Sequence, residues 1–219
     1  MKNAILFGST GMVGSYLLEY LLENPAYDKV TIVVRKDSGI RHPKLTTLIG
    51  DLNSLSSLKE NIQADDVFIA LGTTKAKTPD EKEYYKIDHD YPVEAARISK
   101  EKGATSVFLV SAVGPDPNSR VFYVRTKAET ERDLLALDYV HTHIFRPSMI
   151  MGNRKEKRPM ERLFIGLFNL INPLLFSSKF RGIQAKDIAL AMNNAAQRPA
   201  AKSKIYYWKE MQEFIHSPR

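Results

Sequence analysis

A glycine-rich turn near the start of the chain constrains the fold more than any other feature. The turn has the pattern G-x-x-G-x-x-G, follows the short apolar run Ala4–Phe7, and leads into residues 13–22, whose apolar positions have helical spacing. Glycine lets the backbone turn sharply and approach a phosphate closely, and the N-terminus of the next helix offers free N–H groups to it. This order of strand, turn and helix predicts a dinucleotide-binding turn. It consists of Gly8, Ser9, Thr10, Gly11, Met12, Val13 and Gly14.

The hydrophobic pattern beyond the turn alternates short apolar runs with amphipathic segments. Continuous apolar strands separated by amphipathic helices are typical of a parallel sheet covered on both faces, and right-handed crossovers then favour a doubly wound α/β fold. We expect one Rossmann-type domain over residues 1–219, with a small C-terminal cap around 153–183. The expected strands are 4–7, 30–34, 45–49, 67–71, 107–110, 141–145 and 205–208, and the expected helices are 13–22, 55–61, 91–102, 122–137 and 185–197.

The composition excludes several classes of protein. The chain has no cysteine, which rules out a disulfide framework and a thiolate metal site. Its five histidines are scattered, so we expect no metal. The N-terminal residues lack the apolar stretch of a secretory signal, and we therefore expect a cytoplasmic protein.

The net charge of +7 and one long apolar tract bear on possible partners. The densest basic cluster, residues 154–158, contains a glutamate and is not interleaved with aromatic residues, so we predict no nucleic-acid binding. The tract 163–176 is 14 residues long, too short for a membrane span of about 20 residues. We interpret it as part of the core or a lid, with a partner surface as the alternative. We expect a small-molecule substrate and a monomer or homodimer.

The end of the second expected strand bears on the choice of dinucleotide. An acid near this point holds the ribose 2′-hydroxyl of NAD, whereas an arginine accommodates the 2′-phosphate of NADP. The strand ends in Arg35 and Lys36, and a guanidinium can bind a phosphate through two hydrogen bonds. Asp37 follows directly and keeps NAD open as the less favoured cofactor. The sequence therefore predicts NADP, bound by Arg35 and Lys36.

Three residues after the fifth expected strand have the chemistry of a carbonyl–alcohol oxidoreductase. Tyr123 and Lys127 are four residues apart, so both lie on one face of the expected helix. The Lys127 ammonium is expected to lower the pKa of Tyr123, which could then exchange a proton with a carbonyl or alcohol oxygen while hydride passes to or from a nicotinamide. Ser111, at the carboxyl end of the strand, would hold that oxygen by a hydrogen bond.

Taken in order, the glycine turn, Ser111 and Tyr123-x-x-x-Lys127 resemble the short-chain dehydrogenase/reductase superfamily, in its atypical and extended branch. The segments 70–74 (ALGTT), 88–91 (DHDY) and 145–147 (FRP) are similar to a narrower group, the Tat-interacting-protein-like reductases and their bacterial relatives. The resemblance is closest over residues 4–162.

The resemblance implies further residues of the site and an activity. Asp51 and Leu52 match the segment at the adenine, Lys127 would also hold the nicotinamide ribose, and the remaining cofactor residues are Leu71, Gly72, Thr73, Pro147 and Ser148. The implied function is an NADP-dependent oxidoreductase acting on a small carbonyl or alcohol. Because the C-terminal part is short and the group has regulatory members, a dinucleotide-binding regulatory or interaction protein without turnover is the alternative.

Overall fold

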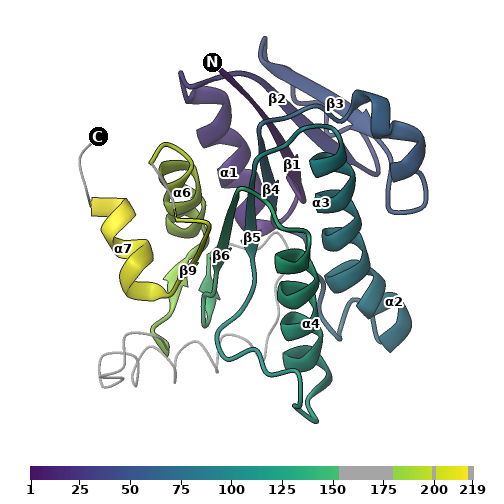
Figure 1. Cartoon of the computed structure of the whole chain (residues 1–219), viewed down its shortest axis with the longest axis vertical. Coiled ribbons are helices and arrows are strands. Elements are labelled where there is room, and N and C mark those ends of the chain that lie inside the picture. The colour runs from purple at the N-terminus through teal and green to yellow at the C-terminus, as the bar shows by residue number, and fades with distance from the viewer. Residues whose placement is uncertain (153–179, 199–200, 217–219) are drawn as a thin grey trace.

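A computed structural model describes residues 1–152, 180–198 and 201–216, and its centre is a parallel sheet of seven strands in the order β3-β2-β1-β4-β5-β6-β9 (Figure 1). Each neighbouring pair of strands is parallel. The doubly wound α/β fold expected from the sequence is confirmed. The strands are β1 (Lys2–Phe7), β2 (Tyr27–Val34), β3 (Leu45–Ile49), β4 (Asp66–Ile69), β5 (Ser106–Val110), β6 (His141–Phe145) and β9 (Ser203–Tyr206).

Helices cover both faces of the sheet (Figure 1). Alternate side chains of β1 point to opposite faces, as the pleat of a strand requires: Ala4 and Leu6 join one buried apolar cluster, and Ile5 and Phe7 join the other. The first cluster is covered by α1 (Met12–Glu23), α6 (Ala185–Ala195) and α7 (Trp208–His216). The second is covered by the 3₁₀ helix η1 (Leu55–Asn61), α3 (Tyr91–Glu101) and α4 (Phe122–Ala136).

The helix expected at residues 91–102 is α3, which begins at Tyr91, but two helical segments that the sequence pattern did not predict precede it. The short α2 (Glu81–Tyr85) runs through a π-helical segment, η2 (Lys86–Asp90), directly into α3. Pro92 has no N–H to donate to the Asp88 carbonyl four residues before it, and a break in the helical ladder at such a position is common. Thr130 Oγ1, from α4, donates to that carbonyl at 2.9 Å instead. The proline thus leaves a backbone acceptor that ties η2 to α4.

The C-terminal part differs from the expectation in detail. Strand β9 ends at Tyr206, and Trp208 begins α7, a helix that the sequence pattern did not predict. The Glu210 carboxylate accepts a hydrogen bond from the Tyr207 N–H at 2.9 Å, which stabilises the start of this helix. The strands β7 (Ile150–Met151) and β8 (Ile183–Gln184) form a second, two-stranded parallel sheet.

The expected cap lies outside the described residues except for 180–183, and the apolar tract 163–176 lies outside them entirely. Within the ranges that the structure describes, no helix is long and apolar enough to cross a membrane.

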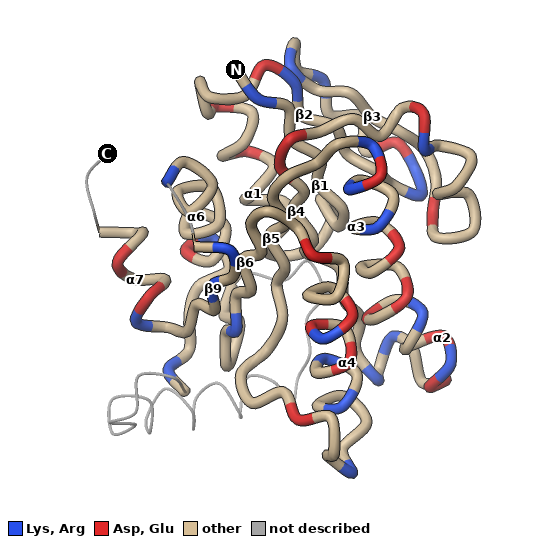
Figure 2. Tube along the Cα trace, in the orientation of Figure 1, with Lys and Arg blue, Asp and Glu red and all other residues tan. Residues whose placement is uncertain are grey.

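Charged residues of both signs are interspersed along the helices that cover the second cluster (Figure 2). Lys86 pairs with Glu83 at 2.7 Å, and Arg97 pairs with Glu94 at 2.6 Å, each one helical turn apart. The charges of Lys86 and Arg97 are therefore each balanced by a glutamate on the same helical stretch.

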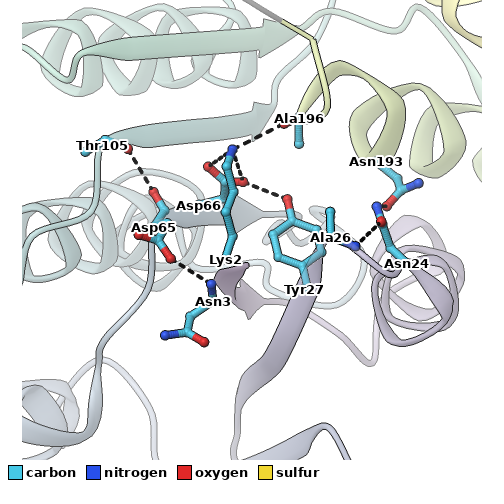
Figure 3. A network of polar contacts seen from close by, with 10 residues as sticks. All are labelled: Lys2, Asn3, Asn24, Ala26, Tyr27, Asp65, Asp66, Thr105, Asn193 and Ala196. Atoms are coloured by element: carbon cyan, nitrogen blue, oxygen red, sulfur yellow. Dashed lines mark hydrogen bonds and ion pairs between the residues drawn. The ribbon is translucent and has the colours of Figure 1, made fainter. Parts of the chain in front are cut away.

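The amino ends of the central strands are closed by a buried polar network (Figure 3). The carboxylate of Asp66, which is completely buried, lies 3.1 Å from Lys2 Nζ and accepts a hydrogen bond from Tyr27 Oη at 2.7 Å. Lys2 also donates to the Ala196 carbonyl at the end of α6. A buried carboxylate needs such partners because leaving it unpaired costs several kcal/mol. The network stabilises the edge opposite the carboxyl ends of the strands.

His143 on β6 gives the fold a predicted sensitivity to acid. Its ring stacks on Phe108, with ring centroids 4.4 Å apart, and its Nδ1 lies 2.7 Å from Tyr206 Oη. Burial, followed by nearby positive charges, lowers the pKa of His143 to about 4. The unfolded chain binds this proton near pH 6.5, whereas the folded chain binds it only near pH 4. The free energy of unfolding is therefore expected to fall by up to about 3 kcal/mol as the pH drops from 6.5 to 4.

Urea unfolding of the wild-type chain and of His143→Gln across this pH range measures the effect. The glutamine does not titrate, so the variant should lose less stability on acidification than the wild type. His42→Gln, at an exposed position, provides the control and should behave like the wild type. Equal pH dependence in the wild type and His143→Gln would contradict the prediction.

Candidate functional site

The glycine turn between β1 and α1 packs tightly against the end of β4. Gly8 has a φ of 93°, and a Cβ at this position would lie 2.5 Å from the Ala70 carbonyl oxygen. A Cβ on Gly14 would lie 2.0 Å from the Gly8 carbonyl oxygen. The Gly11 N–H donates to the same carbonyl at 3.0 Å. Side chains are thus excluded at Gly8 and Gly14 by backbone atoms.

Two features of this turn fit a bound pyrophosphate. Helix α1 has no side-chain cap at Gly11, so its first N–H groups are left to an external acceptor. Ser9 is buried, and its Oγ has no hydrogen-bond partner among the described residues. A buried hydroxyl without a partner is unfavourable, and a phosphate oxygen would satisfy it. Thr10, Met12 and Val13 complete the turn as expected.

The residues expected at the adenosine end come together near α3. Arg35 and Lys36 are exposed just after β2, and Asp51 follows β3. Tyr91 has its pKa raised to about 12, first by burial and then by the charge of Asp51, while the charge of Arg35 opposes the rise. Arg35, Asp51 and Tyr91 are therefore within electrostatic reach of one another. Tyr91 was not predicted as a binding residue, although it ends the DHDY segment.

The two acids of this region, Asp37 and Asp51, each form hydrogen bonds within their own loop. Asp51 Oδ1 accepts hydrogen bonds from the N–H groups of Asn53 and Ser54, which holds the loop that contains Leu52. Asp37 pairs with Arg41 at 2.9 Å and also accepts a hydrogen bond from the Gly39 N–H. The Arg41 guanidinium and the Gly39 N–H lower the pKa of Asp37. Asp37 is the acid that left NAD as the alternative cofactor in the sequence analysis. Its carboxylate is bound to groups of its own loop.

A buried ion pair joins α4 to η2, and η2 in turn is hydrogen-bonded to the loop after β4. Lys127 Nζ lies 2.8 Å from Asp88 Oδ1, and both side chains are buried. Asp88 Oδ2 accepts a hydrogen bond from the Thr73 N–H at 2.7 Å. A Cβ on Gly72 would lie 3.5 Å from Asp88 Oδ1, in ordinary contact, while Leu71 packs against the second apolar cluster. The structure therefore brings Gly72, Thr73 and Lys127 together around one carboxylate.

The pKa of Tyr123 differs from the expectation. Lys127 does lower it, but burial of the hydroxyl is the largest influence and the Asp88 carboxylate adds to it, so the pKa of Tyr123 is raised. The Tyr123 residue as a whole is 42% exposed. The expectation of a lowered pKa was wrong because it counted the charge of Lys127 without the burial of the tyrosine, which is the larger influence, and without the Asp88 carboxylate.

The Ser111 hydroxyl, which was expected to hold a substrate oxygen, is bonded to a side chain of the protein. Its Oγ donates a hydrogen bond to Glu131 on α4, and the Glu131 carboxylate is paired with Arg146. The Val113 N–H donates to the Pro147 carbonyl at 3.0 Å, which places Pro147 beside the segment after β5. Ser148 Oγ donates to the Arg181 carbonyl at 2.7 Å. The structure brings Ser111 and Pro147 together, and it turns the Ser148 hydroxyl toward the chain before β8.

Sequence reasoning missed Asp88 and Glu131 as members of this site. Asp88 lies in the DHDY segment that contributed to the resemblance, but nothing local indicates its partner. Glu131 follows Lys127 by four residues, just as Lys127 follows Tyr123. That spacing puts all three side chains on one face of a helix, so Glu131 could have been found from the sequence.

His89 follows Asp88 and has both ring nitrogens in contact with carboxylates. Its Nδ1 lies 2.8 Å from Asp90 Oδ1, and its Nε2 lies 2.9 Å from Asp133 Oδ2. Over the described ranges, no group of three histidine, aspartate or glutamate side chains is arranged to hold a metal ion. These contacts link η2 to α4 beside the Asp88–Lys127 pair.

Similar sequences are found among fungal proteins named "Protein fmp52, mitochondrial". The protein from Aspergillus niger is 34% identical, and the match covers 98% of each chain. The protein from Kluyveromyces lactis is 37% identical over 69% of each chain. Because these relatives are named as mitochondrial, the expectation of a cytoplasmic protein is contradicted, and the relatives point to mitochondria. The N-terminal pattern tested only for a secretory signal, which does not bear on this compartment.

Solved structures share the fold at low sequence identity. The Bordetella bronchiseptica enzyme WbmH, solved in complex with NAD⁺, has a TM-score of 0.70 and 19% identity, and the match covers 94% of this chain and 75% of that one. The ADP-L-glycero-D-manno-heptose-6-epimerase of Helicobacter pylori has a TM-score of 0.67 and 17% identity, with coverage of 96% and 80%. The sequence profile of the NAD(P)H-binding family matches residues 8–158. The chain belongs to this NAD(P)H-binding family.

Proposed function

We propose that this protein is an NADP-dependent oxidoreductase that acts on a small carbonyl or alcohol substrate. One observation carries the proposal: Lys127, on the same helix as Tyr123, is buried and ion-paired beside the Gly72–Thr73 loop. A buried ammonium is costly unless it has a partner. Lys127 lies near both Tyr123 and the Gly72–Thr73 loop, an arrangement that suits proton transfer from Tyr123 to a substrate oxygen.

The raised pKa of Tyr123 favours one direction of reaction. At neutral pH a tyrosine with a raised pKa keeps its proton, and it can donate that proton to a carbonyl oxygen. The nicotinamide supplies the hydride when it is bound. Lys127 orients this end of the site and is itself positioned by Asp88. We therefore propose carbonyl reduction with NADPH as the reaction favoured at neutral pH.

The choice of NADP rests on Arg35 and is tested by binding. In fluorescence titrations we expect NADPH to bind more tightly than NADH, and Arg35→Ala to reduce this preference by about tenfold or more, since it removes a charged hydrogen-bond donor to the 2′-phosphate. Arg132→Ala, at an exposed position on α4, removes the same charge elsewhere and should keep the preference. Tighter binding of NADH would reject the role of Arg35, and binding of neither dinucleotide would reject the proposal.

Asp88→Asn is expected to change the pH dependence of carbonyl reduction. The Asp88 carboxylate raises the pKa of Tyr123 and pairs with Lys127, so its removal should lower that pKa. Reduction needs protonated Tyr123, and kcat/KM should therefore begin to fall at a lower pH in the variant. Initial rates of NADPH oxidation between neutral and alkaline pH measure the shift.

Asp90→Asn serves as the matched control for this change. Asp90 is in the same π-helical segment, but its carboxylate contacts His89 instead of Lys127. Its pH profile should follow that of the wild type. If the profiles of Asp88→Asn and wild type coincide, Asp88 has no influence on the proton of Tyr123.

A dinucleotide-binding regulatory protein is the second candidate. It is favoured by the Ser111 hydroxyl, which is already bonded to Glu131 within the protein. Tight NADPH binding without turnover of any compound in a panel of aldehydes and ketones would support this second function over the first.

A further inference from the structure

The edge strand β3 has backbone groups without a partner in the described part of the chain. β3 lies at one end of the seven-stranded sheet, next to β2. The Lys44 carbonyl and the Gly50 N–H are both bonded to β2. Because these groups alternate in direction along a strand, the N–H and C=O groups of Leu45, Thr47 and Ile49 point away from β2. Of these groups, only the Leu45 N–H is bonded within the described residues, to the turn before β3.

The two edge strands of the sheet differ in how they are protected. Edge strands commonly carry a charge, a proline or a bulge, which prevents them from pairing with another chain. The edge strand β9 has Lys204 within it, with Nζ 5.3 Å from the centre of the Tyr206 ring. β3 has the sequence LTTLI, without charge or proline, and its pairing with β2 is regular along its whole length. β3 therefore lacks the features that keep an edge strand unpaired.

The outward backbone groups of β3 are complementary to a second copy of themselves. When two β3 strands lie antiparallel with Thr47 opposite Thr47, each Thr47 N–H meets the carbonyl of the partner's Thr47. In the same register, each Ile49 N–H meets the carbonyl of the partner's Leu45. We propose that two copies of this chain form a symmetric dimer through their β3 edges, which joins their sheets into one continuous sheet.

The side chains at this edge fit the same arrangement. Directly opposite residues of antiparallel strands share a face of the sheet, so Ile49 of one copy lies beside the partner's Leu45. Ile49 is 51% exposed in the single chain. An open hollow of about 510 Å³ lies beside this face of β3, and its lining includes Leu45, Thr47, Ile40 and Pro43. The dimer places each Ile49 side chain at the hollow of the other copy and removes apolar surface from water.

The charges next to β3 favour an antiparallel partner. Lys44 directly precedes the strand, and Asp51 follows Gly50 at its other end. Lys44 Nζ donates to the Asn24 carbonyl at 3.0 Å, which holds it at this edge without neutralising its charge. In the antiparallel register, Lys44 lies opposite the partner's Gly50 and one residue from the partner's Asp51. A parallel arrangement of two β3 strands would instead place like charges side by side, which is unfavourable.

Sedimentation velocity of the full chain over a concentration series measures the dimer. We expect the wild type to dimerise. Ile49→Lys should raise the dissociation constant of the dimer by about tenfold or more, because symmetry introduces the ammonium into the apolar contact twice. Ile205→Lys is the matched control. Ile205 is 38% exposed on the opposite edge strand, β9, so this variant should dimerise like the wild type.

Thr47→Cys tests the register of the two strands. The chain has no cysteine, so any disulfide formed by this variant joins two chains. Residues that form a hydrogen-bonded antiparallel pair have Cα atoms about 5.5 Å apart, which is within the range that a disulfide spans. Mild oxidation should therefore convert the variant into a covalent dimer on a non-reducing gel. Ser203→Cys, at an exposed position of β9, should stay unlinked under the same conditions.

The dimer through β3 is overturned by any of four results. These are a wild type that stays monomeric at every concentration, a dimer that Ile49→Lys leaves unchanged, and equal cross-linking of Thr47→Cys and Ser203→Cys. The fourth is loss of the dimer in Ile205→Lys alone, which would place the interface at β9. Weakening by Ile49→Lys together with selective cross-linking of Thr47→Cys supports the proposal.

Discussion

Replacing Gly14 with alanine is expected to weaken NADPH binding by about a hundredfold or more. The added Cβ would lie 2.0 Å from the Gly8 carbonyl oxygen, a backbone atom that can move only if the turn between β1 and α1 opens. Opening the turn would displace both the Ser9 hydroxyl and the start of α1 from the phosphates. Loss of two charged hydrogen bonds corresponds to a decrease in affinity of about a hundredfold or more.

Fluorescence titration with NADPH measures the loss, and circular dichroism confirms that the variant is folded. Ser15→Ala is the matched control, because Ser15 is exposed on the same helix and its replacement adds no atoms. It should bind NADPH like the wild type. A folded Gly14→Ala variant with unchanged affinity would show that the turn is not the phosphate site.

The second large effect is expected for Tyr123→Phe. Removal of the hydroxyl takes away the proton donor for the carbonyl oxygen, and general acid catalysis of this kind contributes about 10²- to 10⁴-fold to rate. We expect kcat for carbonyl reduction to fall by this factor while the affinity for NADPH stays the same. Stopped-flow or steady-state oxidation of NADPH measures the rate, and titration measures the affinity.

Tyr85→Phe provides the control for this change. The Tyr85 ring stacks on His89 in the neighbouring helical segment, and its hydroxyl is bonded to Glu129, so its loss should leave kcat unaltered. A genuine turnover rate that survives in Tyr123→Phe would remove Tyr123 from the chemistry. If Tyr123→Phe lowered the affinity for NADPH as much as it lowered kcat, Tyr123 would be a cofactor-binding residue and not a proton donor.

Burial of Tyr123, together with the Asp88–Lys127 pair, explains why the pKa of Tyr123 was misjudged from the sequence. The spacing of Tyr123 and Lys127 predicts that they share a helix face, and the structure has both on α4. The carboxylate that balances Lys127 comes from a different helix, where Pro92 leaves the Asp88 carbonyl free to bond with Thr130. Nothing in the local pattern of α4 indicates this partner.

The sequence by itself determined the features that depend on short stretches of chain. Glycine at positions 8 and 14, the alternation of apolar strands with helices, and the helical spacing of Tyr123 and Lys127 follow from backbone conformation and periodicity over a few residues. These features sufficed to predict the doubly wound fold and the tight glycine turn between its first strand and first helix.

Only the tertiary structure decided which buried charges face one another. Asp88 meets Lys127, and Glu131 meets Ser111 and Arg146, because η2, α4 and the ends of β5 and β6 pack together. These partners are far apart in sequence, so their pairing is set by packing, for which short-range periodicity carries no signal. The raised pKa of Tyr123 also follows from packing, because burial of the tyrosine is its largest cause and the Asp88 carboxylate adds to it.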